Sequence, residues 1–472
     1  MIKKILIANR GEIALRIVRA CAEMGIISVA IYSDADQYSL HVKKADYAYT
    51  IGPEPVAGYL DINKIVQLAK TTGCDAIHPG YGFLSEIPEL ATACEEQNII
   101  YIGPSPAAIA QMGDKTQARA LMKKANVPTT PGSDGILADE EAAVVLAEKI
   151  GYPVMLKAAA GGGGRGIRLV NNEQELRRQY PRVVSEATKA FGQAGIFLEK
   201  AILNPKHIEV QILADKQGHV VHLFDRDCSI QRRHQKLIEI APSPQITEEQ
   251  RKLITSYAIK AAEAVHYTNA GTVEFLVDER GDIYFMEMNT RLQVEHTITE
   301  QITGIDIVQQ QIRIASGKPL PFAQKDIQKR GYAMEFRINA EDPRHDFLPS
   351  FGRITRYYPP GGPGIRLDSA IYTGYKIPPY FDSMCAKLTI WALDWPSLIA
   401  RAKRALEEMH MYGVKTTIPY YLQIVKTNDF QQAHFTTAFI EKHPELLQYS
   451  TRTSQHHVAS VIAVAISAYL GR

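Results

Sequence analysis

The sequence predicts a multidomain protein of the α/β and α+β classes, with a doubly wound parallel sheet at its N-terminus. Its 472 residues exceed what one ordinary hydrophobic core holds, which indicates about two to three domains. Strand and helix patterns alternate over roughly the first 110 residues. From about residue 150 the pattern changes to strands around a glycine-rich turn. Alternation of the first kind is typical of a parallel sheet covered by helices.

In the first region, apolar runs at 4–8 and 28–34 have the pattern of short buried strands. Between them, residues 11–25 carry apolar side chains at helical spacing, and Gly25 ends that helix. The alternation continues with a helix at 61–73, a strand at 75–80, and then a further helix and a strand at 99–104.

The second region is rich in strands. We expect them at 152–160, 167–170, 196–200, 207–215 and 219–229, and again at 332–340, 353–361 and 384–393, followed by a helix at 395–409. The segment PPGGPG at 359–364 is too short for a flexible hinge and predicts a turn.

Composition narrows the function classes. Lys and Arg total 53 against 51 for Asp and Glu, so the net charge of +2 gives no support to a general nucleic-acid binder. The five cysteines form no CxxC pair and no metal-ligand spacing, and their number is odd. Free thiols in a reducing cytoplasm are the plain interpretation.

No targeting or membrane segment is expected. The apolar start of the chain is too short for a signal peptide. The run at 458–470 is the most apolar, but it is shorter than the roughly 18 to 20 residues that a spanning helix needs. We expect a packing or docking helix there instead of a membrane contact.

A glycine-rich segment at 161–166 lies between two expected strands, with Lys157 just before it. Glycines let backbone N–H groups close around phosphate oxygens, and a nearby lysine adds positive charge. A flexible hairpin tip is the competing interpretation. The segment is not a Walker loop, because no Gly-Lys-Ser/Thr follows.

Acidic and amide side chains occur in two neighbouring apolar strands. Glu274 lies in GTVEFLV, and Glu287 and Asn289 lie in YFMEMNTR. Hard oxygen ligands of this kind hold Mg²⁺. A solvated hairpin face is the alternative, although an unpaired carboxylate in an apolar strand would be costly.

Arg291 follows those acids directly, and its guanidinium fork can bind a planar oxyanion such as bicarbonate. Glu295 could then remove the proton of a small acid held there. A salt bridge between Arg291 and Glu295 at a helix start is the competing explanation. In the segment RDCSIQRRHQK, the residues Gln231, His234 and Lys236 would share one face of an extended chain, which suits a polyphosphate; a basic surface strand is the alternative.

The chain resembles the biotin carboxylase component of biotin-dependent carboxylases, a branch of the ATP-grasp family, from about residue 2 to about 445. The resemblance depends on these stretches in this order: ANRGEIALR, HPGYGFLSE, MGDKTQAR, GGGGRGIRLV, RDCSIQRRHQK, GTVEFL, MEMNTRLQVEH, RINAEDP and GYKIPPYFDSM. It implies an N-terminal Rossmann-like domain at 1–112, an ATP-grasp domain at 113–328 with a mobile lid at about 131–202, a C-terminal α+β domain at 329–445 and a tail at 446–472.

The resemblance also implies a role for each matching residue. ATP would contact Lys115, Lys157, Gly163, Gly164, Glu199, Lys200, Ile202, His207, Gln231 and His234. Glu274, Glu287 and Asn289 would hold two Mg²⁺ or Mn²⁺ ions. Bicarbonate would lie against Lys236, Arg291, Gln293 and Val294. Glu295 would be the general base on bicarbonate, and Arg337 would steady the biotin enolate.

Departures from the family pattern define the expected partners. No Ala-Met-Lys-Met biotinyl motif and no second catalytic domain are present, so a biotinylated carrier and a carboxyltransferase polypeptide are expected. Ile240 favours the biotin carboxylase subunit of a split, two-polypeptide pyruvate carboxylase over that of acetyl-CoA carboxylase. The tail extends past the usual family end and is expected to help dock the partner. Arg16 and its helix match the family's dimer-forming face, so a homodimer is expected.

Three rival functions remain to be weighed. A nucleotide-dependent dehydrogenase lacks its G-x-G-x-x-G turn here. Another ATP-grasp enzyme, one that joins an acid to an amine, would not need RLQVEH and RINAEDP together. A non-catalytic ATP-binding module would not need the acids and bases named above.

Overall fold

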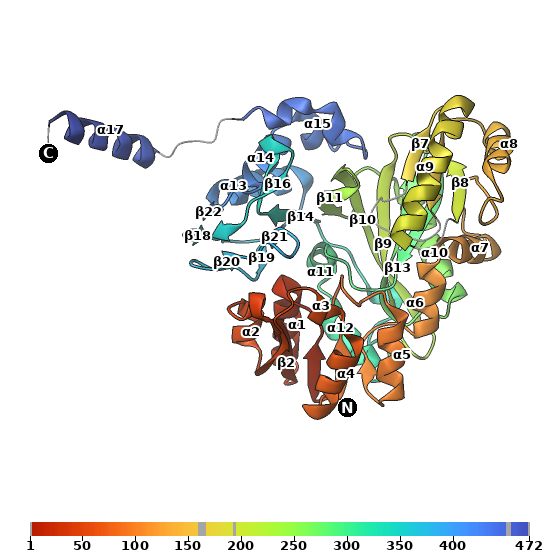
Figure 1. Cartoon of the computed structure of the whole chain (residues 1–472), viewed down its shortest axis with the longest axis horizontal. Helices are drawn as coiled ribbons and strands as arrows, with labels where there is room; N and C mark the ends of the chain where they lie inside the picture. Colours follow the sequence, from red (N-terminus) through yellow and green to blue (C-terminus); the bar gives the residue numbers. More distant parts are fainter. Residues whose placement is uncertain (1, 159–166, 192–194, 450–454, 471–472) are drawn as a thin grey trace.

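The structure is a computed structural model that describes residues 2–158, 167–191, 195–449 and 455–470. The ribbon shows an N-terminal α/β part, a central part that carries a small separate sheet at its edge, and a C-terminal part in which helices pack on strands (Figure 1). The fold class predicted from the sequence, α/β together with α+β, is confirmed.

The N-terminal part is a doubly wound parallel sheet. Its strand order is β3-β2-β1-β4-β5, and all neighbouring pairs are parallel. The strands are β1 (Lys4–Ile7), β2 (Ile27–Ser33), β3 (Tyr47–Gly52), β4 (Ala76–His78) and β5 (Ile100–Tyr101). The helices are α1 (Gly11–Glu23), α2 (Leu40–Lys44), α3 (Ala57–Leu60), α4 (Ile62–Thr71), α5 (Pro88–Glu96) and α6 (Pro106–Gly113).

Helix α1 shows how the local sequence produces this arrangement. Ile13, Ile17 and Ala20 are buried, as their helical spacing predicts. Gly25 has a φ of 66°, a region that glycine enters without steric cost, and the chain leaves the helix there.

The small sheet lies within the range expected to form a lid. Its strand order is β7-β6-β8, and its apolar side chains form a core cluster of their own together with those of two helices. The elements are β6 (Val154–Ala158), β7 (Ile167–Val170), β8 (Ile196–Lys200), α8 (Glu140–Ile150) and α9 (Glu173–Phe191), and α7 (Lys115–Lys124) precedes them. The expected glycine turn at 161–166, including Gly163 and Gly164, lies outside the described residues.

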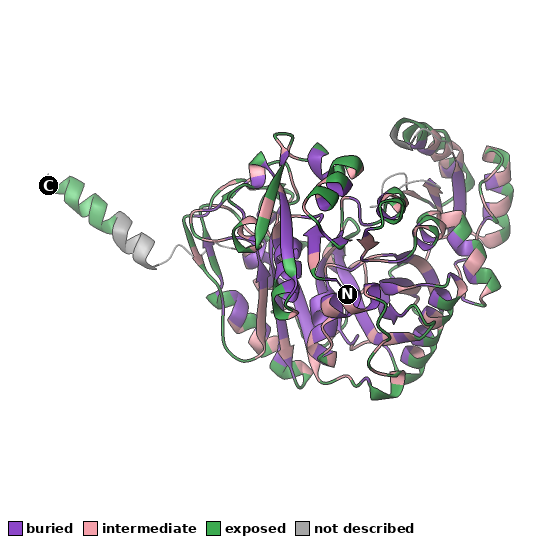
Figure 2. Ribbon diagram, turned by 90° about the horizontal axis from the view of Figure 1, so that it is seen from below, coloured by how far each residue is buried: buried purple, intermediate pink, exposed green. Residues whose placement is uncertain are grey.

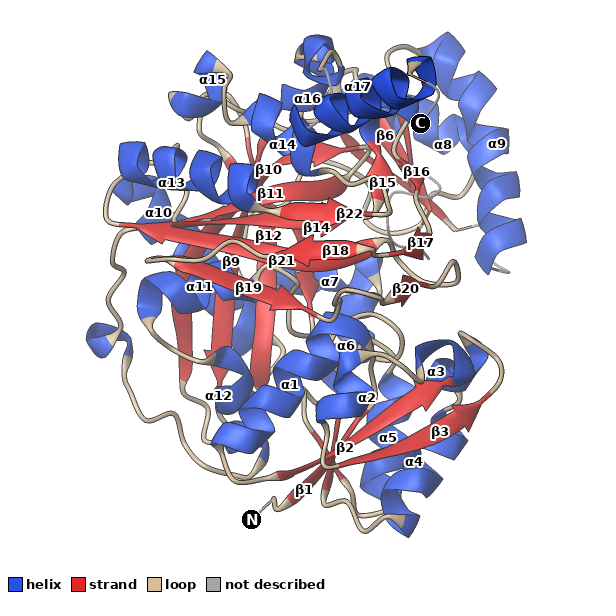
Figure 3. Cartoon of the chain, turned by 90° about the vertical axis from the view of Figure 1, so that its left-hand side faces the viewer, coloured by secondary structure: helices blue, strands red, loops and turns tan. Residues whose placement is uncertain are grey.

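The largest sheet has eight antiparallel strands in the order β13-β12-β9-β10-β11-β14-β21-β19 (Figure 3). Its strands are β9 (Lys206–Ala214), β10 (Val220–Arg232), β11 (Gln235–Ala241), β12 (Asn269–Val277), β13 (Ile283–Asn289), β14 (Tyr332–Asn339), β19 (Ile365–Ser369) and β21 (Met384–Ala392). Because β11 pairs with β14, one continuous sheet joins the central part to the C-terminal part.

The longer helices of these two parts pack on this sheet. They are α10 (Glu248–Ala264), α11 (His296–Thr303), α12 (Ile307–Ala315) and α13 (Trp395–Glu408). The strand expected at 353–361 is two short ones, β17 (Gly352–Arg353) and β18 (Arg356–Tyr358), because Ile354 and Thr355 separate their ladders. Smaller elements complete the fold: α14 (Ile418–Ile424), α15 (Asn428–Gln431), α16 (Phe439–Lys442), β15 (Glu341–Asp342), β16 (Leu348–Pro349), β20 (Lys376–Ile377) and β22 (His410–Tyr412).

The last helix, α17 (Gln455–Tyr469), projects away from the rest of the chain (Figure 1). Residues 462–470 are exposed (Figure 2), including Ile462, Val464 and Ile466. Among the described residues, no helix combines the length and the hydropathy needed to cross a membrane.

Candidate active site

Two glutamates face each other across the β12–β13 hairpin. Glu274 pairs with Glu287, and Thr272 pairs with Asn289. Residues opposite each other in an antiparallel pair point to the same face. Asn289 also donates from Nδ2 to Oε1 of Glu274 at 2.8 Å. The hairpin therefore brings together all three side chains expected to hold a metal ion.

The carboxylate of Glu287 fits a cation site. Among the described residues, no hydrogen bond or ion pair reaches it, although burial and the negative charge of Glu274 raise its pKa. A carboxylate without a protein partner, facing a second carboxylate, offers hard oxygen ligands to a divalent cation. The residues present therefore fit Mg²⁺ or Mn²⁺.

Lys236 lies at the centre of a buried acidic cluster. Its Nζ donates to Glu209 at 2.6 Å, to Glu274 at 3.0 Å and to Glu295 at 2.7 Å. His207 reaches the same cluster, with Nε2 at 2.7 Å from Oε2 of Glu274. Burial by itself raises the pKa of Glu274, but Lys236 and His207 bring that pKa far below its usual range.

The segment 231–236 is a hairpin and not the extended face that the sequence suggested. The chain turns at Arg233 and His234, whose φ angles are 49° and 66°. Gln231 and Lys236 are therefore opposite each other on β10 and β11, and His234 lies in the turn. Gln231 is buried and Lys236 is nearly so, so neither side chain belongs to a basic surface strand, whereas Arg233 and His234 in the turn are exposed.

Glu295 is fully buried and is held by two cations. Lys236 contacts its Oε1, and Arg337 donates from Nη2 to its Oε2 at 3.1 Å. Burial raises the pKa of Glu295, but Lys236 and Arg337 more than reverse this and lower the pKa well below its usual range. Arg337 also donates to Glu239 at 2.6 Å, and burial raises the pKa of Glu239 to about 7.

The guanidinium of Arg291 is fixed on several sides. It lies 2.9 Å from Oε2 of Glu86, and it donates to Oε1 of Gln293 at 3.1 Å and to Oδ1 of Asn289 at 3.2 Å. Within the described residues, no hydrogen bond or ion pair joins Arg291 to Glu295. A salt bridge at the helix start therefore does not explain why these two charged residues occur close together in the sequence. Fixed in this way, the guanidinium can present its remaining N–H groups to a planar anion.

A second cluster lies where the small sheet faces the body of the protein. Glu199 on β8 accepts from Arg119 at 2.7 Å and from Thr130 at 2.8 Å, and it also contacts Lys157. Burial and the positive charges of Lys115 and Arg119 lower the pKa of Lys157 to about 7. The charged residues of this cluster can therefore respond to a bound polyphosphate.

The other expected ligand contacts have different surroundings. Lys200 donates to the carbonyls of Gly151 and Tyr152 at 2.9 Å and 3.0 Å. The carbonyl of Val294 accepts from Lys387 at 2.9 Å. Ile202 is half-buried after β8.

Sequence reasoning missed several charged residues of these clusters: Glu86, Arg119, Glu209, Arg226 and Glu239. For Glu209 and Glu239 a signal was present, because each has apolar residues on both sides in the sequence. Arg226 lies between Asp225 and Asp227 and gave no such signal. The positions of Glu86 and Arg119 in their segments gave no such signal.

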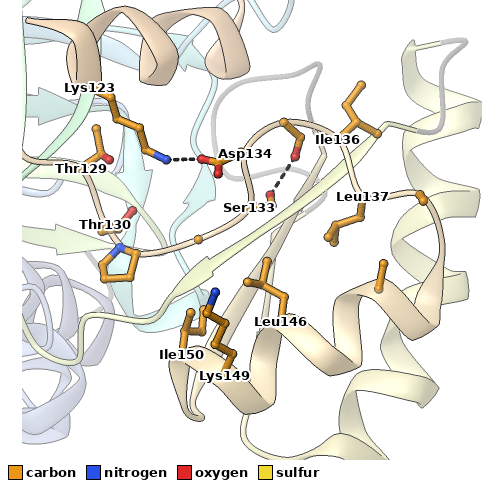
Figure 4. A pocket seen from close by; sticks show the side chains of 15 residues that line it. Lys123, Thr129, Thr130, Ser133, Asp134, Ile136, Leu137, Leu146, Lys149 and Ile150 are labelled. Carbon is orange, nitrogen blue, oxygen red and sulfur yellow. Dashed lines mark hydrogen bonds and ion pairs between the residues drawn. The ribbon is translucent and has the colours of Figure 1, made fainter.

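A hollow in the described surface lies elsewhere, between α7, α8 and the loop that joins them (Figure 4). Lys123, Asp134 and Lys149 are among its lining residues, and none of the residues expected to bind ATP lines it. The charged clusters, and not this hollow, are therefore the candidate site.

Comparisons with known proteins show which family and fold the chain shares. Family models match three successive segments: the biotin carboxylase N-terminal domain at residues 1–109, the ATP-binding domain of the carbamoyl-phosphate synthase L chain at 114–323 and the biotin carboxylase C-terminal domain at 335–442.

Individual relatives cover nearly the whole chain. The 2-oxoglutarate carboxylase small subunit of Hydrogenobacter thermophilus is 54% identical over 471 residues, which is 100% of both chains. A pyruvate carboxylase subunit of Methanothermobacter thermautotrophicus is 53% identical over 94% of this chain and 90% of its own. The biotin carboxylase domain dimer of the Hydrogenobacter enzyme, solved with MgADP, ADP and bicarbonate, superposes with a TM-score of 0.93 at 55% identity, over 96% of this chain and 100% of that one.

Proposed function

The chain belongs to the biotin carboxylase family, and we propose that it uses ATP and bicarbonate to carboxylate biotin that another polypeptide carries. One observation carries the proposal most directly. Glu295 is a buried carboxylate kept ionised by Lys236 and Arg337, and the fixed guanidinium of Arg291 comes shortly before it in the chain. A base and several cations around one small space suit an acidic anion such as bicarbonate.

Bicarbonate is proposed to bind among the cations that now hold Glu295. Arg291 would supply a two-point contact, and Lys236 a point charge. Gln293 and Val294 belong to the same short segment and would complete the site. When the anion enters, it would take over contacts that Lys236 and Arg337 now make with Glu295, which would free that carboxylate to accept the proton.

The phosphoryl step follows from this arrangement. Once Glu295 has taken its proton, a bicarbonate oxygen would attack the γ-phosphorus of ATP, and the bond to ADP would break. Lys157 and Lys236 would neutralise charge on the transferring group. ATP is proposed to lie between the small sheet and the body, against the remaining expected contacts: Lys115, Gly163, Gly164, Glu199, Lys200, Ile202, His207, Gln231 and His234.

Glu274, Glu287 and Asn289 would hold the two Mg²⁺ or Mn²⁺ ions. When bound, these cations would supply positive charge to the phosphate oxygens of ATP. The fit is supported by the carboxylate of Glu287, which has no hydrogen bond or ion pair within the part of the chain that the structure describes.

The second half-reaction would use the carboxyphosphate formed in the first. Carboxyphosphate would break down to CO₂ and phosphate, and the phosphate would remove the N1 proton of biotin. The resulting enolate would form its new N–C bond with CO₂ while Arg337 balances its negative charge. Exclusion of water matters because carboxyphosphate is otherwise hydrolysed. The segment at 131–202 is proposed to act as the lid.

The partner is proposed to be a polypeptide that carries both biotin and carboxyltransferase, and the acceptor to be a 2-oxo acid. Pyruvate was expected from Ile240, but that side chain is fully buried in the core beside Met334, so packing also restricts it. 2-Oxoglutarate becomes a second candidate because the small subunit of the carboxylase that uses it matches the full length of this chain.

Helix α17 is proposed to dock this partner. It carries no acidic residue in its first turn and no basic residue in its last, and its described apolar side chains are exposed. The helix contains no Asp, Glu, Lys or Arg, and exposed apolar side chains grouped in this way favour burial against another surface. Truncation after Tyr449 should therefore abolish co-purification of the biotinylated partner while ADP release with free biotin continues; unchanged co-purification would refute the docking role.

A homodimer is also proposed, because the similar Hydrogenobacter domain is a dimer. Arg16, which was expected to mark the dimer face, is buried within the chain and pairs with Glu300 at 2.9 Å and Asp306 at 2.7 Å. Its neighbour Arg19 has a half-exposed side chain and is the better candidate for a contact between subunits.

The decisive experiment measures acid-stable fixation of labelled bicarbonate by this chain together with its co-purifying biotinylated partner, ATP and Mg²⁺. Pyruvate, 2-oxoglutarate and acetyl-CoA are offered separately. Label fixed with one 2-oxo acid identifies the acceptor. Label fixed only with acetyl-CoA overturns the 2-oxo acid proposal, and no bicarbonate-dependent ADP release from the chain overturns the enzymatic proposal itself.

A further inference from the structure

Lys387 on β21 joins three parts of the chain at one buried point. Its side chain is 0% exposed. Its Nζ donates to the backbone carbonyl of Val294 at 2.9 Å and lies 3.3 Å from Oε2 of Glu12. Glu12 comes from α1 and Val294 from the segment between β13 and α11, so this amine links the N-terminal, central and C-terminal parts.

The sheet places other charges around this amine. In the strand pairing, Lys387 lies between Arg337 on β14 and Asp368 on β19. The ring of Tyr81 also lies 5.7 Å from its Nζ. A buried ammonium beside another cation is costly unless oxygens surround it. The Val294 carbonyl and the Glu12 carboxylate supply oxygens to it, and the negative charge of Asp368 on the neighbouring strand adds a favourable interaction.

The segment that Lys387 holds carries the proposed base. Val294 directly precedes Glu295, and α11 begins at the next residue without a side-chain cap from Glu295. The carboxylate of Glu295 can point toward Lys236 and Arg337 only while the backbone of this short segment keeps its present conformation. The hydrogen bond from Lys387 to the Val294 carbonyl therefore fixes the backbone that determines the direction of the Glu295 carboxylate.

We propose that Lys387 is a positioning residue for the bicarbonate site, which acts by fixing the backbone of Val294 and through it the direction of Glu295. This inference rests on the proposed function, because it assigns bicarbonate to that site. Lys387 does not touch the reacting atoms. Its loss displaces the base and the neighbouring backbone, and geometric errors of about 1 Å near a reacting group lower rates by up to about 100-fold.

Glu12 has a different role at the same point. Its two carboxylate oxygens are buried without hydrogen bonds, and burial raises its pKa to about 7 in spite of the charge on Lys387. Glu12 thus balances the charge of Lys387 but does not hold Val294. A matched pair of substitutions can therefore separate charge balance from positioning.

The test compares Lys387→Met, Glu12→Gln and the double variant with the wild-type chain. Bicarbonate-dependent ADP release gives KM for bicarbonate, a binding titration gives Kd for ATP, and urea unfolding gives stability. We expect Lys387→Met to raise KM for bicarbonate by about tenfold or more, with Kd for ATP within about twofold. Glu12→Gln retains the bond to Val294 and should keep KM for bicarbonate within about twofold of wild type.

The double variant decides between positioning and simple stabilisation. It removes the unpaired carboxylate that Lys387→Met leaves, so we expect its stability to recover while KM for bicarbonate stays high. The proposal would be overturned if both stability and KM for bicarbonate returned to wild-type values in the double variant. It would also be overturned if Kd for ATP changed as much as KM for bicarbonate. If Lys387→Met alone does not fold, the double variant carries the same test. A wild-type chain without bicarbonate-dependent ADP release would instead overturn the proposed function.

Discussion

Lys236 donates to Glu295 at 2.7 Å inside a cluster of largely buried charged side chains. Together with the contact from Arg337, it keeps the pKa of Glu295 low. Its charge keeps the carboxylate ionised, so Glu295 does not need to lose a proton before it can act. The same contact occupies Glu295, so an arriving anion has to compete with that carboxylate for Lys236.

Replacement of Glu295 by Gln tests the assignment of the base. The amide keeps nearly the same shape but cannot accept a proton, so we expect bicarbonate-dependent ADP release to fall by about 100-fold or more. Kd for ATP should stay within about twofold of wild type. Glu249→Gln, at an exposed position on α10, serves as the control. Turnover near normal in Glu295→Gln would contradict the assigned role.

Glu287→Gln tests the cation site. The substitution removes one hard anionic ligand from the pair facing across β12 and β13, so the Mg²⁺ concentration for half-maximal ADP release should rise by about tenfold or more. Glu279→Gln, an exposed residue beyond the end of β12, is the matched control and should leave the Mg²⁺ requirement unchanged. An unchanged Mg²⁺ requirement in Glu287→Gln would remove Glu287 from the metal site.

The pKa of Lys157 predicts proton uptake on ATP binding. With a pKa of about 7, the amine is mostly neutral at about pH 8 in the ligand-free protein. A bound polyphosphate favours the charged form and raises that pKa, so binding at about pH 8 should take up as much as about one proton, and binding at about pH 5.5 almost none.

Calorimetry in two buffers of different ionisation enthalpy measures this uptake directly. Lys157→Met should abolish it, whereas Lys149→Met, at an exposed position on α8, should not. Equal uptake at both pH values would show that Lys157 is not the group responsible.

Arg226 provides a test of stability. It is fully buried and donates to Gln211 at 2.7 Å, Thr272 at 2.9 Å and Thr299 at 3.0 Å, and it also contacts Glu209. Arg226→Met removes one partner of a buried ion pair, which should lower the free energy of unfolding by about 3–5 kcal/mol.

Urea unfolding measures this loss. Arg280→Met, whose side chain is 80% exposed, should change the same free energy by less than about 0.5 kcal/mol. A loss below about 1 kcal/mol for Arg226→Met would show that Lys236 and the other polar groups compensate for the missing guanidinium.

The prediction of secondary structure succeeded where the pattern of apolar residues within a short segment was sufficient to identify the helix or strand. The spacing of Ile13, Ile17 and Ala20 is sufficient to define α1, and the alternating elements predicted the parallel sheet. The extended face predicted for 231–236 failed because the positive φ angles of Arg233 and His234 reverse the chain there. Neither arginine nor histidine is a residue type from which such a turn is normally predicted.

The sequence was sufficient to select candidate charged residues for the site, but it did not show which other side chains they contact. A carboxylate in an apolar strand is costly, so Glu274 and Glu287 could be singled out from the sequence alone. Their facing arrangement required the strand register, in which a shift by one residue would turn one of them to the other side.

The family and the order of the elements could thus be established from the sequence, and the candidate site residues could be proposed from it, because periodicity and side-chain chemistry are recorded along the chain. The pairing of Arg291 with Glu86 and the bond from Lys387 to Val294 became known from the folded chain alone. A buried charge is stabilised by whichever opposite charge or carbonyl the fold brings within hydrogen-bonding distance. That partner lies on a distant segment, and no spacing in the sequence specifies it.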